Sequence, residues 1–228
     1  MSFRLSYRDD PGNPWFSWQY LRDNSDTVVA ALRDHTTLTL RAVLIAALVA
    51  VPLAVLAYWY RPLTGPILAL TGVLYTVPSL ALFAFIAPYL GIGVVTVLSV
   101  VVLYALLVIV RNTVAGLNQV PAEVREAAEG MGYGRWGRLL RVELPLALPG
   151  ILTGLRLATV STVALVTVGV VIGRGGLGQI IFAGFQNNFY KSQIMTGTLL
   201  CVLLALVLDL LLVGVGRLLT PWLRGRAG

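Results

Sequence analysis

The positions of the charged residues divide the chain into long apolar stretches. Charge is absent from residues 42–59, 62–110, 157–173 and 192–208. A helix that spans a bilayer needs about 20 mostly apolar residues, so the second stretch is long enough for two. The sequence Pro88-Tyr89-Leu90-Gly91-Ile92-Gly93 divides it, because proline and paired glycines interrupt helices. The pattern therefore predicts an all-α, polytopic membrane protein with about five transmembrane helices, at about 38–60, 64–88, 92–110, 147–172 and 195–219.

Composition supports a membrane protein over a soluble domain. Apolar residues make up 57% of the 228 residues and charged residues only 12%, about half the usual fraction for a soluble domain. The net charge of +7 indicates basic loops at a cytoplasmic face, and we expect no nucleic-acid partner. The single cysteine, Cys201, excludes an intramolecular disulfide and a cysteine-cluster metal site, so we expect no bound metal.

The distribution of basic residues gives an orientation and three segments. Nine arginines lie on the side of the 111–146 loop and seven basic residues on the other side, which favours a cytoplasmic loop and an external N-terminus. We expect an external or interfacial segment at 1–37, a transmembrane domain at 38–219 and a cytoplasmic tail at 220–228. The first segment has no apolar signal-peptide core, and its aromatic rings suit the headgroup zone. The alternative is a disordered tail.

The loop 111–146 is the only long polar stretch between the predicted spans. Pro121 suits a first helical position, and Glu123 suits the positive end of a helix dipole, so a short helix is predicted to about Gly130. The glycines at 130, 132 and 134 then interrupt it. A second amphipathic piece over 135–142 is expected to end at Pro145, with an apolar face of Trp136, Leu139 and Leu140. A generic surface hairpin is the alternative to a functional loop.

This loop resembles the EAA loop of ABC importer permeases. That loop has Glu-Ala-Ala, three residues, Gly, nine residues, an Ile position, one residue and Leu-Pro. This chain has the same spacing, with valine in place of isoleucine as its one departure, in Glu126-Ala127-Ala128, Gly132, Val142 and Leu144-Pro145. The resemblance implies the methionine-importer-like permease fold. It also implies a location in the bacterial cell membrane, and a coupling helix within 111–146 that docks into a cleft of an ATP-binding subunit. The ATPase-coupling residues that it implies are Arg125, Glu126, Ala127, Ala128, Gly130, Gly132, Val142, Leu144 and Pro145.

Other segments resemble the osmoprotectant branch of these permeases. They include Tyr75-Thr76-Val77-Pro78-Ser79-Leu80, Arg111-Asn112-Thr113 and Ile172-Gly173-Arg174-Gly175-Gly176-Leu177-Gly178, although alanine is common where Arg174 stands. This resemblance implies import of a small zwitterionic or quaternary ammonium solute such as glycine betaine, choline, carnitine or proline. It also implies a second permease subunit, two ATPase subunits and an external substrate-binding protein. The alternatives are a methionine-type or phosphonate importer and, in another class, a secondary transporter that works without ATP.

No nucleotide site is expected in the chain itself. Gly173, Gly175 and Gly178 match the dinucleotide-binding spacing, but they follow a membrane span, and the next acidic residue is as far away as Asp209. We interpret the glycines as an external turn followed by a short helix over 179–185. The chain contains no Gly-x4-Gly-Lys-Ser/Thr loop, so ATP and Mg²⁺ are expected on the partner ATPase. We expect no catalytic residue and no cofactor in this chain.

Six residues are candidates for a translocation path or gate: Tyr75, Pro78, Ser79, Tyr104, Arg156 and Asp209. Tyrosine rings suit a quaternary ammonium through cation–π contact, with simple packing as the alternative. Arg156 and Asp209 lie inside predicted spans, where ionisable residues pair with each other, extend to the interface or line a water-filled path. His35 and Cys201 are interpreted as structural, and Pro52, Pro66 and Pro78 as possible helix kinks.

Overall fold

The computed structural model describes residues 12–222, and all of the regular elements in that range are helical. The long helices are α2 (Ser25–Trp59), α5 (Val94–Asn118), α8 (Leu144–Val168) and α10 (Lys191–Leu219). The short elements are α1 (Trp18–Asp23), α3 (Arg61–Thr76), α4 (Ser79–Leu90), α6 (Ala122–Gly130), α7 (Arg135–Arg138), the π-helix η1 (Leu139–Glu143), the 3-10 helix η2 (Gly169–Ile172) and α9 (Leu177–Gln186).

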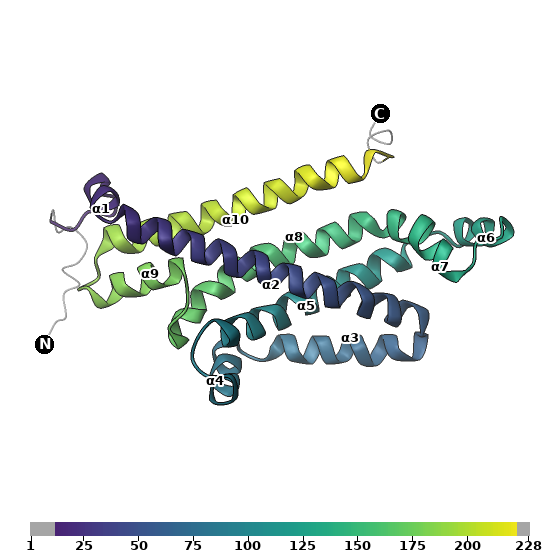
Figure 1. Cartoon of the computed structure of the whole chain (residues 1–228), viewed down its shortest axis with the longest axis horizontal. Coiled ribbons are helices and arrows are strands. Elements are labelled where there is room, and N and C mark those ends of the chain that lie inside the picture. The colour runs from purple at the N-terminus through teal and green to yellow at the C-terminus, as the bar shows by residue number, and fades with distance from the viewer. Residues whose placement is uncertain (1–11, 223–228) are drawn as a thin grey trace, which may run out of the picture.

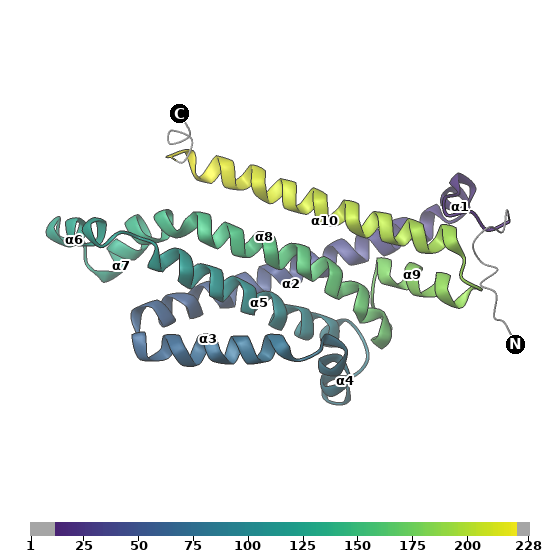
Figure 2. The same cartoon turned by 180° about the vertical axis from the view of Figure 1, so that it is seen from behind.

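The long helices lie side by side in an elongated bundle (Figure 1). One end of the bundle carries α6 and α7, and the opposite end carries α1 and α9 (Figure 1). We call these the α6 end and the α9 end. Seen from behind, α8 lies between α5 and α10 (Figure 2). Length and composition allow α2, α5, the continuous helix Arg135–Ile172 and α10 each to cross a bilayer, and the bent pair α3 and α4 forms either a fifth, broken span or a re-entrant loop.

Small residues bring the central helices close together. On α2 the fully buried alanines Ala42, Ala46, Ala50 and Ala54 recur once per helical turn, so they form one face of that helix. Where α5 crosses α8, a Cβ atom built on Gly150 would lie 2.8 Å from the Cα atom of Gly116. In membranes such small residues allow close backbone packing, which replaces the hydrophobic drive that lipid cannot provide.

The second predicted span, 64–88, is not one straight helix. It divides into α3 and α4, which are bent by 97° at Val77 and Pro78. The break removes the helical partner of the Val77 carbonyl, and the Tyr104 hydroxyl donates a hydrogen bond to that oxygen. Proline explains only part of this difference from prediction, because Pro52 and Pro66 lie inside helices that continue past them.

The expected boundary at residue 37 does not coincide with a break in the fold. Helix α2 begins at Ser25, thirteen residues before the predicted first span, so residues 25–37 continue straight into it. The alternative of a disordered tail is wrong for residues 18–37, of which all but Asn24 are helical. Residues 1–11 and most of the expected tail, 223–228, lie outside the described range. The other predicted spans, 92–110, 147–172 and 195–219, correspond to α5, α8 with η2, and α10.

The segment before α1 is fastened to the corner between α9 and α10. The Asn13 side chain donates to the Phe189 carbonyl at 3.0 Å and accepts from the Lys191 amide at 2.9 Å. Tyr20 meets Tyr190 edge to face at 5.4 Å between ring centroids. Burial, together with the neighbouring Tyr190, raises the pKa of Tyr20 above its ordinary value. The N-terminal residues are therefore part of the packed α9 end.

Candidate coupling site and membrane path

Helix α6 projects from the tip of the α6 end (Figure 1). Pro121 precedes it as the N-cap residue, and Glu123 lies in its first turn. Glu126 and Ala127 are exposed, whereas Ala128 is 1% exposed and packs against the chain itself. Within the Glu-Ala-Ala triplet, Glu126 and Ala127 therefore face away from the chain, whereas Ala128 packs inward and holds α6 against it.

The turn after α6 depends on glycine. Gly132 has φ +84°, in the left-handed region that glycine adopts without strain. The Tyr133 amide donates to the Ala128 carbonyl at 3.1 Å, which satisfies a carbonyl at the end of α6. Met131, beside this turn, is 70% exposed. The turn thus adds an exposed apolar side chain to the surface of Glu126 and Ala127.

A network of charged and hydroxyl groups joins this loop to two long helices. Arg138 forms ion pairs with Glu129 of α6 and, at 2.9 Å, with Glu143 of η1. Tyr58, near the end of α2, donates to Glu143 at 3.3 Å and accepts from Arg125 of α6 at 3.1 Å. The side chain of Glu143 is fully buried, so its charge needs these partners. The network ties α6, α7 and η1 to the end of α2.

Sequence reasoning named Arg125 as a residue that couples to a partner ATPase, whereas in the structure its guanidinium donates to Tyr58 of the chain itself. It missed Tyr58, Arg138 and Glu143 altogether. Glu143 stands between Val142 and Leu144 in the matched motif, and an acid inside an apolar run is the signal that points to a buried ion pair.

The predicted stop at Pro145 is wrong. From Arg135 to Ile172 the chain runs as one helix, through α7, η1, α8 and η2. Pro145 lies inside this continuous helix, two residues after the π-helical turn η1, so the irregular hydrogen-bond pattern falls beside the residue that has no amide hydrogen. Val142, Leu144 and Pro145 are half-buried at this junction. Of the expected apolar face, Leu139 is buried, while Trp136 and Leu140 are 64% and 60% exposed.

The candidate path residues separate into two places. Tyr75 and Tyr104 meet edge to face at 6.0 Å between centroids, beside the break that holds Pro78 and Ser79. Tyr75 is 55% exposed and lines a cavity of about 180 Å³ between α3 and α5, together with Thr71, Arg111 and Asn112. This cavity combines an aromatic ring with hydrogen-bond donors.

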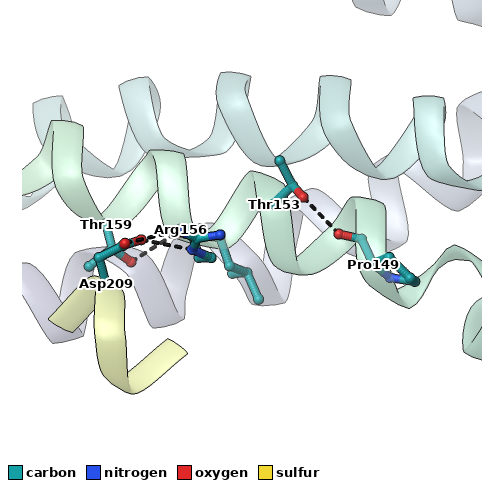
Figure 3. Close-up of polar contacts among 6 residues, drawn as sticks. Pro149, Thr153, Arg156, Thr159 and Asp209 are labelled. Carbon is teal, nitrogen blue, oxygen red and sulfur yellow. Dashed lines mark hydrogen bonds and ion pairs between the residues drawn. The ribbon is translucent and has the colours of Figure 1, made fainter. Parts of the chain in front are cut away.

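Arg156 and Asp209 form the second place, between α8 and α10. The Nε and Nη2 atoms of Arg156 donate to the two carboxylate oxygens of Asp209 at 2.8 and 2.9 Å, and the side chains point toward each other (Figure 3). Such a two-bond pair satisfies both charges. Of the three possibilities that the sequence left open for these residues, the structure shows that they pair with each other.

The glycine-rich turn belongs to the packed α9 end. Gly176 has φ +50°, and a Cβ atom there would lie 2.6 Å from the Cβ atom of His35. His35 is fully buried, accepts from the Leu177 amide at 3.3 Å and donates through its other ring nitrogen to the Val163 carbonyl at 3.1 Å. Its structural interpretation is confirmed. The turn follows η2 and leads into α9, the expected short helix.

Comparison with known proteins agrees with this architecture. The family model described as binding-protein-dependent transport system inner membrane component matches residues 37–225. The osmoprotectant import permease protein OsmW of Salmonella typhimurium is 39% identical over 207 residues, which cover 89% of this chain and 96% of OsmW. The choline transport system permease protein OpuBB of Bacillus subtilis is 36% identical over 203 residues, which cover 89% and 93% of the two chains.

A solved structure shares the fold. A chain of the MetNI methionine ABC transporter in an inward-facing conformation aligns with a TM-score of 0.77 at 21% identity, covering 87% of this chain and 98% of that one. The family model and the two relatives confirm the permease family expected from the loop spacing. The chain is a multi-pass membrane protein that belongs to the family of binding-protein-dependent transport system inner membrane components.

Proposed function

We propose that the chain is the permease subunit of an ATP-driven importer for compatible solutes such as glycine betaine, choline, carnitine or proline. The observation that carries the proposal is α6, which exposes Glu126 and Ala127 at the tip of a helical membrane bundle. A small side chain beside an acid suits close docking in a cleft of another protein. The ATPase-coupling role of this loop follows from that surface and from the spacing of Glu126, Gly132 and Pro145.

The substrate class rests on the named relatives and on one feature of the chain. The relatives above carry the names of an osmoprotectant and a choline permease. The cavity between α3 and α5 places the Tyr75 ring beside Arg111 and Asn112. An aromatic face attracts a quaternary ammonium, and amide and guanidinium groups bind a carboxylate. Both groups of a zwitterionic solute would therefore find a complement there.

The partners follow from the same proposal. A pore would form between two permease subunits, identical or paralogous, with two ATPase subunits at the α6 end and a substrate-binding protein at the α9 end. The α6 end would then be cytoplasmic and the α9 end external. ATP and Mg²⁺ would bind to the ATPase, and its closure would move α6 as a lever on the spans.

The coupling role is tested with the double variant Glu126→Ala, Gly132→Ala. We expect loss of ATPase co-purification and of solute uptake, with unchanged membrane insertion. Gly214→Ala is the matched control, because nothing lies within 4 Å of a Cβ atom at that position on α10. Normal assembly and uptake in the double variant would refute the coupling assignment.

The substrate is tested by uptake of radiolabelled betaine, choline, carnitine and proline in a host that lacks its own importers. The chain is expressed with its candidate ATPase and binding protein, and uptake of at least one of the four is expected. Uptake of methionine or a phosphonate alone would overturn the substrate class and leave the permease assignment intact.

A further inference from the structure

A second polar cavity lies at the α6 end, outside the path just described. Its volume is about 490 Å³, and it is bounded by the end of α2, the start of α3 and the loop that carries α6 and α7. Four arginines line it, together with the aromatic side chains of Tyr58 and Trp59: Arg61, Arg125, Arg135 and Arg138. These four are a quarter of the arginines in the chain, gathered around one cavity.

Most of this positive charge is not balanced by carboxylates. Arg138 already pairs with Glu129 and Glu143. Within residues 12–222, no ion pair is found for Arg61, Arg125 or Arg135. The cavity therefore holds a surplus of positive charge.

Aromatic residues, not acids, hold two of these guanidinium groups in place. The guanidinium carbon of Arg135 lies 4.2 Å from the centre of the Trp59 ring, and its Nη2 lies 3.4 Å from the Trp59 carbonyl. Arg125 donates to the Tyr58 hydroxyl. A guanidinium has five N–H donors and binds phosphate oxygens with two at once. Arg135, which stacks on Trp59, and Arg125, which donates to Tyr58, therefore both keep further N–H donors available for a phosphate.

The place of the cavity in the bundle indicates which anion it meets. Tyr58, Trp59 and Tyr60 stand together where α2 ends and the chain turns into α3. Tyrosine and tryptophan concentrate at the level of the lipid headgroups, and basic pockets at the ends of spans bind anionic headgroups. Helix α6 projects further out, so its exposed surface is separate from this level (Figure 1).

We propose that this cavity binds the phosphate group of an anionic phospholipid from the leaflet at the α6 end. Arg61, Arg125 and Arg135 contact the phosphate, and Trp59 keeps Arg135 directed at it. The lipid then links the start of α3 to the loop that carries α6, two parts of the chain that share no ion pair in the described range. The proposal concerns a lipid site and does not depend on which solute the protein transports.

The test uses the purified full-length chain with phosphatidylglycerol as the probe and phosphatidylcholine as the neutral comparison. Lipid retention is measured by native mass spectrometry, and thermal stability is measured as each lipid is added. We expect specific retention of phosphatidylglycerol and a rise in melting temperature. The double variant Arg61→Gln, Arg135→Gln should bind phosphatidylglycerol about 30-fold more weakly, at about one kcal/mol for each arginine.

Matched controls separate a site from general attraction. The variant Arg22→Gln, Arg174→Gln removes the same charge from exposed positions at the α9 end and should keep full retention. Arg61→Gln alone is the variant least able to disturb folding, because the Arg61 side chain is exposed, and it should weaken retention by about 5-fold.

Three results would overturn the proposal. Equal loss of retention in both double variants would mean that only net charge matters. Competition by soluble inorganic phosphate, without any preference for the lipid, would mean an adventitious anion site. Displacement of the lipid when the ATPase subunit is added would mean that acidic groups of that protein occupy the cavity.

Discussion

The Arg156–Asp209 pair should add little net stability while it is complete, and the bundle should lose stability when either half is removed. Arg156 lies twelve residues into α8, about 18 Å along the helix axis, and Asp209 lies ten residues before the end of α10, about 15 Å from that end. Both positions lie well inside helices that are long enough to cross a hydrocarbon core about 30 Å thick. Neither side chain can therefore reach a headgroup easily.

The expected magnitude follows from this depth. A single charged residue at the centre of a spanning helix costs about 2.5–3.5 kcal/mol on insertion scales. Asp209→Leu leaves Arg156 with no carboxylate partner, and Arg156→Leu leaves Asp209 exposed to the same penalty. We expect each single variant to lose about 2–3 kcal/mol of unfolding free energy. The double leucine variant should lie within about 1 kcal/mol of the natural protein, since well-packed apolar residues replace an ion pair at little cost.

The assay is equilibrium unfolding of the purified chain in mixed detergent micelles, followed by tryptophan fluorescence. The coupling energy of the double-mutant cycle should be about 4 kcal/mol. Thr153→Val is the nearby control, because the Thr153 hydroxyl bonds only to the Pro149 carbonyl of its own helix (Figure 3). Additive losses in the double variant, or an Asp209→Leu protein as stable as the natural one, would refute the reasoning.

Three other variants test separate contacts by their effect on unfolding free energy in the same assay. Gly150→Ala should lose about 1–3 kcal/mol, because the new Cβ atom meets backbone of α5, whereas Gly214→Ala, which meets nothing, should be neutral or slightly stabilising. Glu143→Gln should lose about 3 kcal/mol, because it breaks the ion pair of a fully buried carboxylate. His35→Ala should lose at least about 2 kcal/mol, because it opens a cavity and leaves the Leu177 amide without its acceptor. An unchanged unfolding free energy in any of the three would contradict the contact concerned.

Hydropathy predicted the helices well because a segment that crosses lipid can adopt few structures other than a helix. A spanning segment must satisfy its own backbone, so apolar length alone identifies a helix. Hydropathy failed at the ends of helices. The first half of α2 carries Asp26, Arg33 and Asp34 and was therefore excluded from the first span, yet it continues the same helix. Charge ends an apolar stretch, but it does not end a helix.

The break at Val77 could not be read from the apolar pattern. Pro52, Pro66 and Pro78 look alike in sequence, yet only the last stands at a sharp bend. The difference lies in a tertiary contact, because the Tyr104 hydroxyl donates a hydrogen bond to the Val77 carbonyl that the break leaves without a helical partner. Tyr104 is 27 positions away on another helix. The pattern of apolar residues around Val77 therefore cannot indicate that partner.

The coupling site shows the same division between local and tertiary information. Motif spacing identified the residues that face outward, such as Glu126, because a docking surface is a local property of one helix. It did not identify Tyr58 and Glu143, which join that helix to α2 and η1. Since η1 continues without a break into α8, a displacement of α6 must move α2 and α8 with it or break the Arg125–Tyr58 hydrogen bond and the Arg138–Glu129 ion pair. Losing a hydrogen bond of a charged group costs about 1.5–3 kcal/mol, which makes joint movement the easier course. The buried network therefore makes the exposed helix a rigid extension of the two long helices.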